Sequence, residues 1–165
     1  MLPMESFRGR FTNKIDAKGR VSVPAKFRAI VIAQGLNGII CSPSFKGPYL
    51  EAGGPAYGQM LDQMINRLGM FTDPHDDLAA VLYGESHDIS LDGDGRIVLP
   101  EEMRAHANIT DEATFVGFGA RFLIWEPKAY ESYRANALEN ARSKSLGDLL
   151  QPTNAVAPRG EGGGV

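Results

Sequence analysis

Two stretches of the chain alternate apolar and polar residues as β-strands do, and each leads into a tight turn. Residues 11–15 and 87–91 alternate before the turns, and the short apolar or β-branched runs 21–23 and 97–99 follow them. Each turn has an aspartate and, three residues later, a glycine. This spacing is typical of a type I turn followed by a residue with positive φ. The pattern predicts one β-hairpin in each half of the chain.

A short helix is expected after each hairpin. Pro24 and Pro100 come directly after the second strand of each hairpin. Proline fits the first turn of a helix but cannot continue a central strand. We therefore predict helices over residues 25–32 and 101–107, so that each half contains a strand–turn–strand–helix unit.

The segments after these helices differ between the halves. Residues 113–119 and 121–125 flank a Gly-Ala turn and predict a second hairpin in the second half. In the first half, residues 38–42 indicate a strand. The stretch from there to Gly54 holds two prolines and three glycines, which favours a loop.

Three further helices are expected. Apolar residues at helical spacing from Tyr57 to Leu68 predict an amphipathic helix, and Pro127 opens another. A short helix near residues 77–83 joins the halves. From residue 143 onward Gly, Pro, Ser and Asn predominate, so we expect residues 143–165 to be a disordered tail.

The two hairpin units are copies of one another. Residues 16–29 align without gaps on residues 92–105, and six of the fourteen positions are identical. Three more positions are apolar in both copies. We therefore predict the following organisation: a first repeat over residues 7–54, a helical connector over 55–85, a second repeat over 86–130, a C-terminal helix over 131–142 and the tail over 143–165.

Composition narrows the class of protein. The chain has 165 residues, of which 43% are hydrophobic, enough to bury a sizeable core. No apolar run approaches the roughly 20 residues that span a bilayer, and the N-terminal residues lack a signal-peptide pattern. The single cysteine, Cys41, excludes an internal disulfide and a cysteine-rich zinc site. We expect a cytoplasmic protein that does not bind membranes.

The charges separate the two copies. Residues 1–30 carry net charge +5, whereas residues 86–112 carry net charge −5. Lys18 in the first turn corresponds to Asp94 in the second, and Lys26 lies where the second copy has acids at its helix start. A basic strand, turn and helix start favour a polyanion as partner, and a hairpin has the right size for the major groove. The alternative is an ordinary solvated basic face. The cations concerned are Arg8, Arg10, Lys14, Lys18, Arg20, Lys26 and Arg28.

The duplicated Asp-x-x-Gly-Arg motif, each followed by an apolar alternation and a proline, resembles the paired SpoVT-AbrB-like domains of the MraZ proteins. Residues 7–9, 35–38 and 122–125 also resemble that family's pattern, and the likeness covers residues 7–135. The resemblance implies an α+β fold, a duplicated swapped-hairpin β-barrel with short flanking helices. It also implies ring-like homo-oligomers that bind direct repeats in promoter DNA on the nucleoid. Family members typically regulate, often repress, a bacterial division and cell-wall gene cluster.

The motif residues are expected to have two kinds of role. Asp16, Gly19, Asp92, Gly95 and Arg96 are predicted to brace the two turns. Arg20 either reads guanine through a bidentate contact or braces its turn like Arg96. Four other cations of the first copy are interpreted as phosphate contacts, which position DNA without specifying its sequence: Arg8, Lys14, Lys18 and Lys26. Arg10 and Arg28 are predicted to contact DNA without an assigned role.

Catalytic, metal and cofactor sites are not expected. The segment that begins at Asp92 starts like a calcium loop but has Arg96 at the fifth ligand position. Ser86, His87 and Asp88 are adjacent in sequence, whereas a catalytic triad assembles from separate elements. Two other interpretations stay open: an AbrB-like antitoxin-type interaction protein that binds a partner through its tail, and a purely structural assembly.

Overall fold

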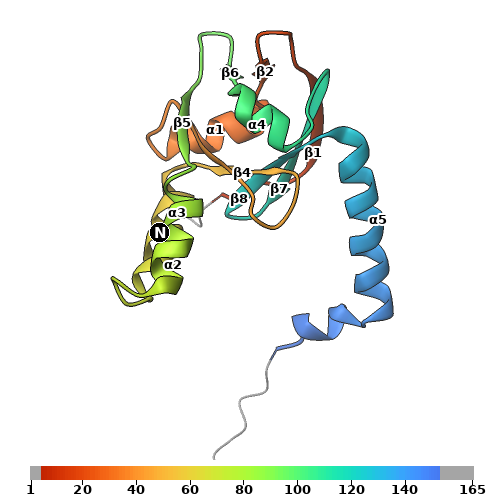
Figure 1. Ribbon diagram of the computed structural model, residues 1–165. Coiled ribbons are helices and arrows are strands. Elements are labelled where there is room, and N and C mark those ends of the chain that lie inside the picture. The colour runs from red at the N-terminus through yellow and green to blue at the C-terminus, as the bar shows by residue number, and fades with distance from the viewer. Residues whose placement is uncertain (1–4, 153–165) are drawn as a thin grey trace, which may run out of the picture. The chain divides into compact units, whose positions relative to one another are not determined.

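The computed structural model describes residues 5–152, and the chain divides after Tyr130 into two compact units. Within the described residues, the first unit contains every strand and four of the helices (Figure 1). Its elements are β1 (Arg10–Lys14), β2 (Arg20–Ser22), α1 (Ala25–Ala33), β3 (Gly38–Pro43), β4 (Leu50–Gly53), α2 (Pro55–Asn66), α3 (Asp73–Leu82), β5 (His87–Ser90), β6 (Arg96–Val98), α4 (Glu101–His106), β7 (Glu112–Phe118) and β8 (Arg121–Trp125). Helix α5 (Pro127–Ser143) begins at the end of this unit, and a 3-10 helix, η1 (Leu146–Leu150), follows it.

The strands form two antiparallel sheets within residues 5–152. One has six strands in the order β1-β7-β8-β4-β3-β5, and the other consists of β2 and β6. A backbone bridge between Ile15 and Val21 links them. The mixed α+β class predicted from the sequence is confirmed.

The strands of each predicted hairpin pair with the other copy. Strand β1 pairs with β7, whereas β5, its counterpart in the second copy, pairs with β3. The ends of these ladders are equivalent: Ile15 N donates to Asp111 O over 2.9 Å, and Leu91 N donates to Asn37 O over 3.0 Å. The two copies therefore interlock as swapped hairpins.

One hydrophobic core unites both copies. Val21 and Val23 of the first copy and Ile97 and Leu99 of the second are all buried in it. Aromatic rings fill its centre, where Phe27 packs edge-on against Phe7 with ring centroids 5.3 Å apart. Both copies contribute residues to this core. The apolar side chains of each hairpin are therefore buried against those of the other copy.

The predicted helices after both prolines are present as α1 and α4, with ends within a residue of those expected. The helix that joins the halves was predicted near residues 77–83, but α3 is longer and begins at Asp73. Thr72 caps it, because its hydroxyl oxygen accepts a hydrogen bond from His75 N.

The prediction of a loop from residue 43 to Gly54 is wrong for residues 50–53, which form β4. Its four residues are all buried, and the strand lies between β3 and β8 in the six-stranded sheet. The glycines and prolines on either side hid a strand that is too short to show an alternation. In the stretch expected to be disordered, residues 146–150 form η1, and residues 153–165 lie outside the described part. No helix within residues 5–152 is long and apolar enough to cross a membrane.

Candidate nucleic-acid interface

The first turn is held by the carboxylate of Asp16. Its Oδ1 accepts hydrogen bonds from the backbone N–H groups of Lys18, at 3.0 Å, and Arg20, at 2.9 Å. Its Oδ2 accepts a hydrogen bond from Arg20 Nε over 2.6 Å. One side chain thus fixes the turn and the direction of the arginine that ends it.

This geometry leaves the far edge of the Arg20 guanidinium available. Nε is engaged with Asp16, but neither terminal nitrogen has a partner among residues 5–152. The Arg20 side chain is 41% exposed. A guanidinium that is buttressed at Nε and open at Nη1 and Nη2 can donate two parallel hydrogen bonds to an external acceptor.

The second turn repeats the clamp and adds a contact. Asp92 Oδ1 accepts from the backbone of Asp94 and of Arg96, both at 2.9 Å, and Asp92 Oδ2 accepts from Arg96 Nε at 3.1 Å. Here, however, Arg96 Nη2 also donates to Asp94 Oδ2 over 3.3 Å. The terminal edge that is open on Arg20 is occupied on Arg96.

Both aspartates have pKa values below the ordinary carboxyl value of 3.8. For each, the main cause is the backbone hydrogen bond from the arginine that ends the turn. These hydrogen bonds favour the charged form, so the clamp persists wherever the carboxylate is ionised. It is lost only as the pH falls through the lowered pKa.

The two arginines lie on one exposed ribbon. In the β2·β6 pairing, Arg20 is opposite Val98 and Ser22 is opposite Arg96, while Val21 and Ile97 face the core. Both turns extend from the same end of the first unit, next to this ribbon (Figure 1). A two-stranded ribbon with this exposure has the dimensions that the major groove admits.

Each copy has one arginine on its helix, Arg28 on α1 and Arg104 on α4, and each lies beside the turn of the other copy. Arg28 Nη1 donates to Val23 O over 2.7 Å, and Arg104 Nε donates to Leu99 O over 3.1 Å. A Cβ on Gly95 would meet the Arg28 guanidinium at 2.6 Å, and one on Gly19 would meet Arg104 Nε at 3.0 Å. Arg28, predicted to contact DNA, therefore lies against the acidic turn and supports the backbone.

Arg104 is the residue that the sequence-based prediction missed. It belongs to the acidic copy, but the swapped pairing brings its guanidinium to the basic turn beside Gly19. Its identity with Arg28 in the internal repeat was the available signal. That signal has spatial meaning only when the two copies are known to interlock.

Two of the other predicted cations lie on the six-stranded sheet. Lys14 is exposed and directly opposite Glu112 in the β1·β7 register. The guanidinium of Arg10 is 5.8 Å from the centre of the Tyr130 ring, where a cation–π interaction is favourable.

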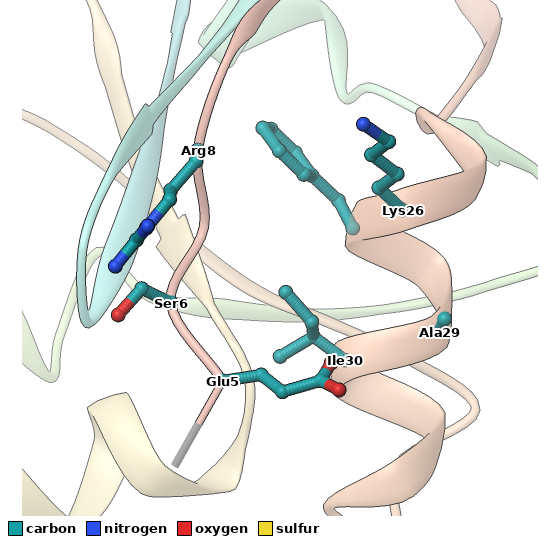
Figure 2. Close-up of a pocket in the computed structure, with 7 residues that line it drawn as sticks. Glu5, Ser6, Arg8, Lys26, Ala29 and Ile30 are labelled. Atoms are coloured by element: carbon teal, nitrogen blue, oxygen red, sulfur yellow. The ribbon is translucent and has the colours of Figure 1, made fainter. Parts of the chain in front are cut away.

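Arg8 and Lys26 lie on either side of a cavity of about 560 Å³ between the N-terminal segment and α1. Figure 2 shows the guanidinium of Arg8 directed away from Lys26. Both side chains are exposed. The cations of the first copy are therefore distributed over the N-terminal segment, β1, the first turn and α1. No group of three or more candidate metal ligands occurs within residues 5–152.

Comparison with known proteins gives a consistent result. The family described as "MraZ protein, putative antitoxin-like" matches residues 82–151. A protein named transcriptional regulator MraZ from Parvibaculum lavamentivorans is 53% identical over 162 residues, which cover 97% of this chain and 99% of that protein. Proteins of the same name from Gluconacetobacter diazotrophicus and Rickettsia bellii are 44% and 40% identical, over 87% and 92% of this chain and 92% and 100% of their own lengths.

The chain belongs to the MraZ family of transcriptional regulators. The resemblance carried by the duplicated motif is thereby confirmed. Transcriptional regulators are generally not enzymes, which agrees with the expectation from the sequence. In this member of the family, the duplicated motif forms two turns with opposite charge at the tip. Each turn is held by the same set of hydrogen bonds to its own aspartate.

Proposed function

We propose that this MraZ-family chain binds double-stranded DNA through its first turn. The observation that carries the proposal is the state of Arg20: Asp16 holds its Nε, and the terminal nitrogens of this partly exposed side chain have no partner in the described part of the chain. Such a preorganised guanidinium matches the O6 and N7 acceptors of guanine in the major groove. In this arrangement Arg20 reads bases and Asp16 is a positioning residue.

The neighbouring cations contact phosphates in this proposal. Lys18 is exposed at the tip of the turn, and Lys26 is exposed in the first turn of α1. Phosphate contacts supply affinity and set the register of the protein on the duplex. Arg8, Arg10 and Lys14 extend the cationic surface along and before β1, whereas Arg28 acts through the backbone it supports.

The regulatory role follows the family. We propose that the chain acts on the nucleoid in the cytoplasm, at direct repeats in the promoter of a division and cell-wall gene cluster, and represses it. A single turn contacts few base pairs and binds weakly. A ring-like homo-oligomer would present several turns to tandem repeats, and effective concentration would raise the affinity.

The test compares two equivalent arginines. Fluorescence anisotropy measures binding of the full chain to a duplex from the region upstream of its own coding sequence. Arg20→Ala removes the proposed base contact and should weaken binding by roughly tenfold or more, because a bidentate contact contributes about 1–3 kcal/mol. Arg96→Ala removes the corresponding side chain of the second turn and should have a much smaller effect.

Folding of both variants is checked by circular dichroism and thermal unfolding. The ion pairs that the two substitutions remove are all partly exposed and contribute little to stability, so both variants should melt at similar temperatures. Equal loss of DNA binding in the two variants, or none in either, would refute the proposed role of the first turn.

A further inference from the structure

The second turn has the backbone and the arginine of a DNA-reading turn. Residues 92–96 reproduce the hydrogen bonds of residues 16–20 position by position, including the clamp on Arg96 Nε. Arg28 lies beside Gly95 just as Arg104 lies beside Gly19. The scaffold and the two arginines are therefore the same in both turns.

Within the turn the charge differs at one position. The sequences are Asp-Ala-Lys-Gly-Arg over residues 16–20 and Asp-Gly-Asp-Gly-Arg over residues 92–96. Lys18 and Asp94 occupy equivalent places, because each donates its backbone N–H to the clamping aspartate, at 3.0 Å and 2.9 Å. A cation at the tip of one turn is replaced by an anion at the tip of the other.

We propose that Asp94 prevents the second turn from contacting DNA, so that one chain reads DNA with one turn and in one orientation. The inference rests on the proposed DNA binding by the first turn. Asp94 acts in two ways: its carboxylate occupies Arg96 Nη2 at 3.3 Å, and its charge, on a side chain 79% exposed, repels an approaching phosphate. Asp94 is thus a specificity-determining residue of this chain.

A change of charge at position 94 should not unfold the protein. The Asp94–Arg96 pair is exposed, and exposed ion pairs contribute little to stability. The first turn already holds a lysine on the same backbone. Asp94→Lys is therefore accommodated, and it makes the charged positions within the second turn identical to those of the first.

The experiment starts from the full chain with Arg20→Ala, which disables the first turn, and uses the upstream duplex at fixed salt. Adding Asp94→Lys should tighten binding roughly tenfold relative to Arg20→Ala alone, since Arg96 then becomes available for a bidentate contact in place of Arg20. Adding Arg96→Ala to this double variant should remove the gain. Asp94→Ala in the Arg20→Ala background should give a smaller gain, because it frees Arg96 Nη2 without adding a cation.

Asp77→Lys is the matched control. It makes the same substitution in α3, at an exposed residue outside both repeats. An equal gain from Asp77→Lys, a gain that survives Arg96→Ala, or no gain from either Asp94 variant would overturn the inference. These outcomes leave the proposed function standing as long as Arg20→Ala weakens binding. Equal binding by the unmodified chain and Arg20→Ala refutes the proposed function, and the inference with it.

Discussion

At the scale of single residues, the two turns show how one side chain can both hold a turn and orient the arginine that ends it. Asp16 satisfies two backbone donors and orients Arg20, so the same carboxylate that shapes the turn also directs the guanidinium. Asp92 does the same for Arg96. One contact therefore both braces the turn and orients the arginine, so bracing is compatible with the base reading that we propose for Arg20.

The glycines of the turns make a prediction at this scale. Gly19 and Gly95 have φ values of +85° and +76°, where a side chain is strained by about 1–3 kcal/mol. A Cβ on Gly19 would also lie 2.7 Å from the backbone oxygen of Leu99, which cannot move aside, whereas one on Gly95 would meet the mobile end of Arg28. Gly19→Ala should therefore lower the free energy of unfolding by more than Gly95→Ala, by about 1 kcal/mol or more.

Urea denaturation of the two alanine variants measures this difference. Both start from equivalent turns, so each serves as the control for the other. A larger loss for Gly95→Ala would show that Arg28 is held more firmly than its place at a side-chain terminus indicates.

At the scale of elements, pairing between the copies decides which segments fold together. Among the described residues 5–85, the only complete strand pair is β3·β4. Strands β1 and β2 and the outer edges of β3 and β4 have their partners in the second copy. The unpaired edges would expose backbone donors and acceptors, and the inward faces would lose half of the core. The repeat visible in the sequence is therefore not a unit that can fold by itself as a monomer.

A fragment experiment tests this interlocking. We expect residues 1–85 alone to lack native β1 and β2, and to regain them when mixed with residues 86–165. Circular dichroism and amide NMR spectra of each fragment and of the equimolar mixture measure the outcome, with the full chain as reference. Native-like dispersion of amide shifts in a monomeric 1–85 fragment would contradict the interlocked assignment. Size-exclusion chromatography separates that case from a swapped dimer of two identical fragments.

At the scale of the whole molecule, the net charge of −3 hides two copies of opposite sign. The swap mixes these charges in space, since Arg28 lies at the acidic turn and Arg104 at the basic one. In physiological salt, exposed charges further apart than a Debye length of roughly 8 Å are largely screened from one another. A polyanion at the first turn would therefore respond to the charges near that turn more than to the net charge of the chain.

Salt dependence gives the prediction at this scale. If Lys18 neutralises one phosphate, Lys18→Glu should reduce the magnitude of the slope of log affinity against log salt by about 0.9 per chain bound. Lys46→Glu makes the same charge change at an exposed position between β3 and β4 and should leave the slope near that of the unmodified chain. Anisotropy titrations over a series of salt concentrations measure both slopes. Indistinguishable slopes for the two variants would exclude Lys18 as a phosphate contact.

Local chemistry made much of this fold predictable from sequence. The Asp-to-Gly spacing indicated both turns, the prolines indicated the starts of α1 and α4, and the short apolar runs indicated the strands in which Val21 and Ile97 are buried. Strand β4 escaped because four residues among glycines and prolines are too few to show a period. The position of Arg104 beside the first turn was not predicted, because its charge was assigned to the second copy, in which it lies along the sequence.

The sequence by itself determined which segments become strands and helices, which faces they bury and which turn carries the cation, because these properties depend on neighbours along the chain. Tertiary structure alone decided the partner of each strand. Backbone hydrogen bonds are the same for every sequence, so periodicity specifies a strand's buried face but not the strand beside it. The strand partners are set by the burial of both halves in one core. The same packing places Arg104 beside the basic turn and Arg28 beside the acidic turn.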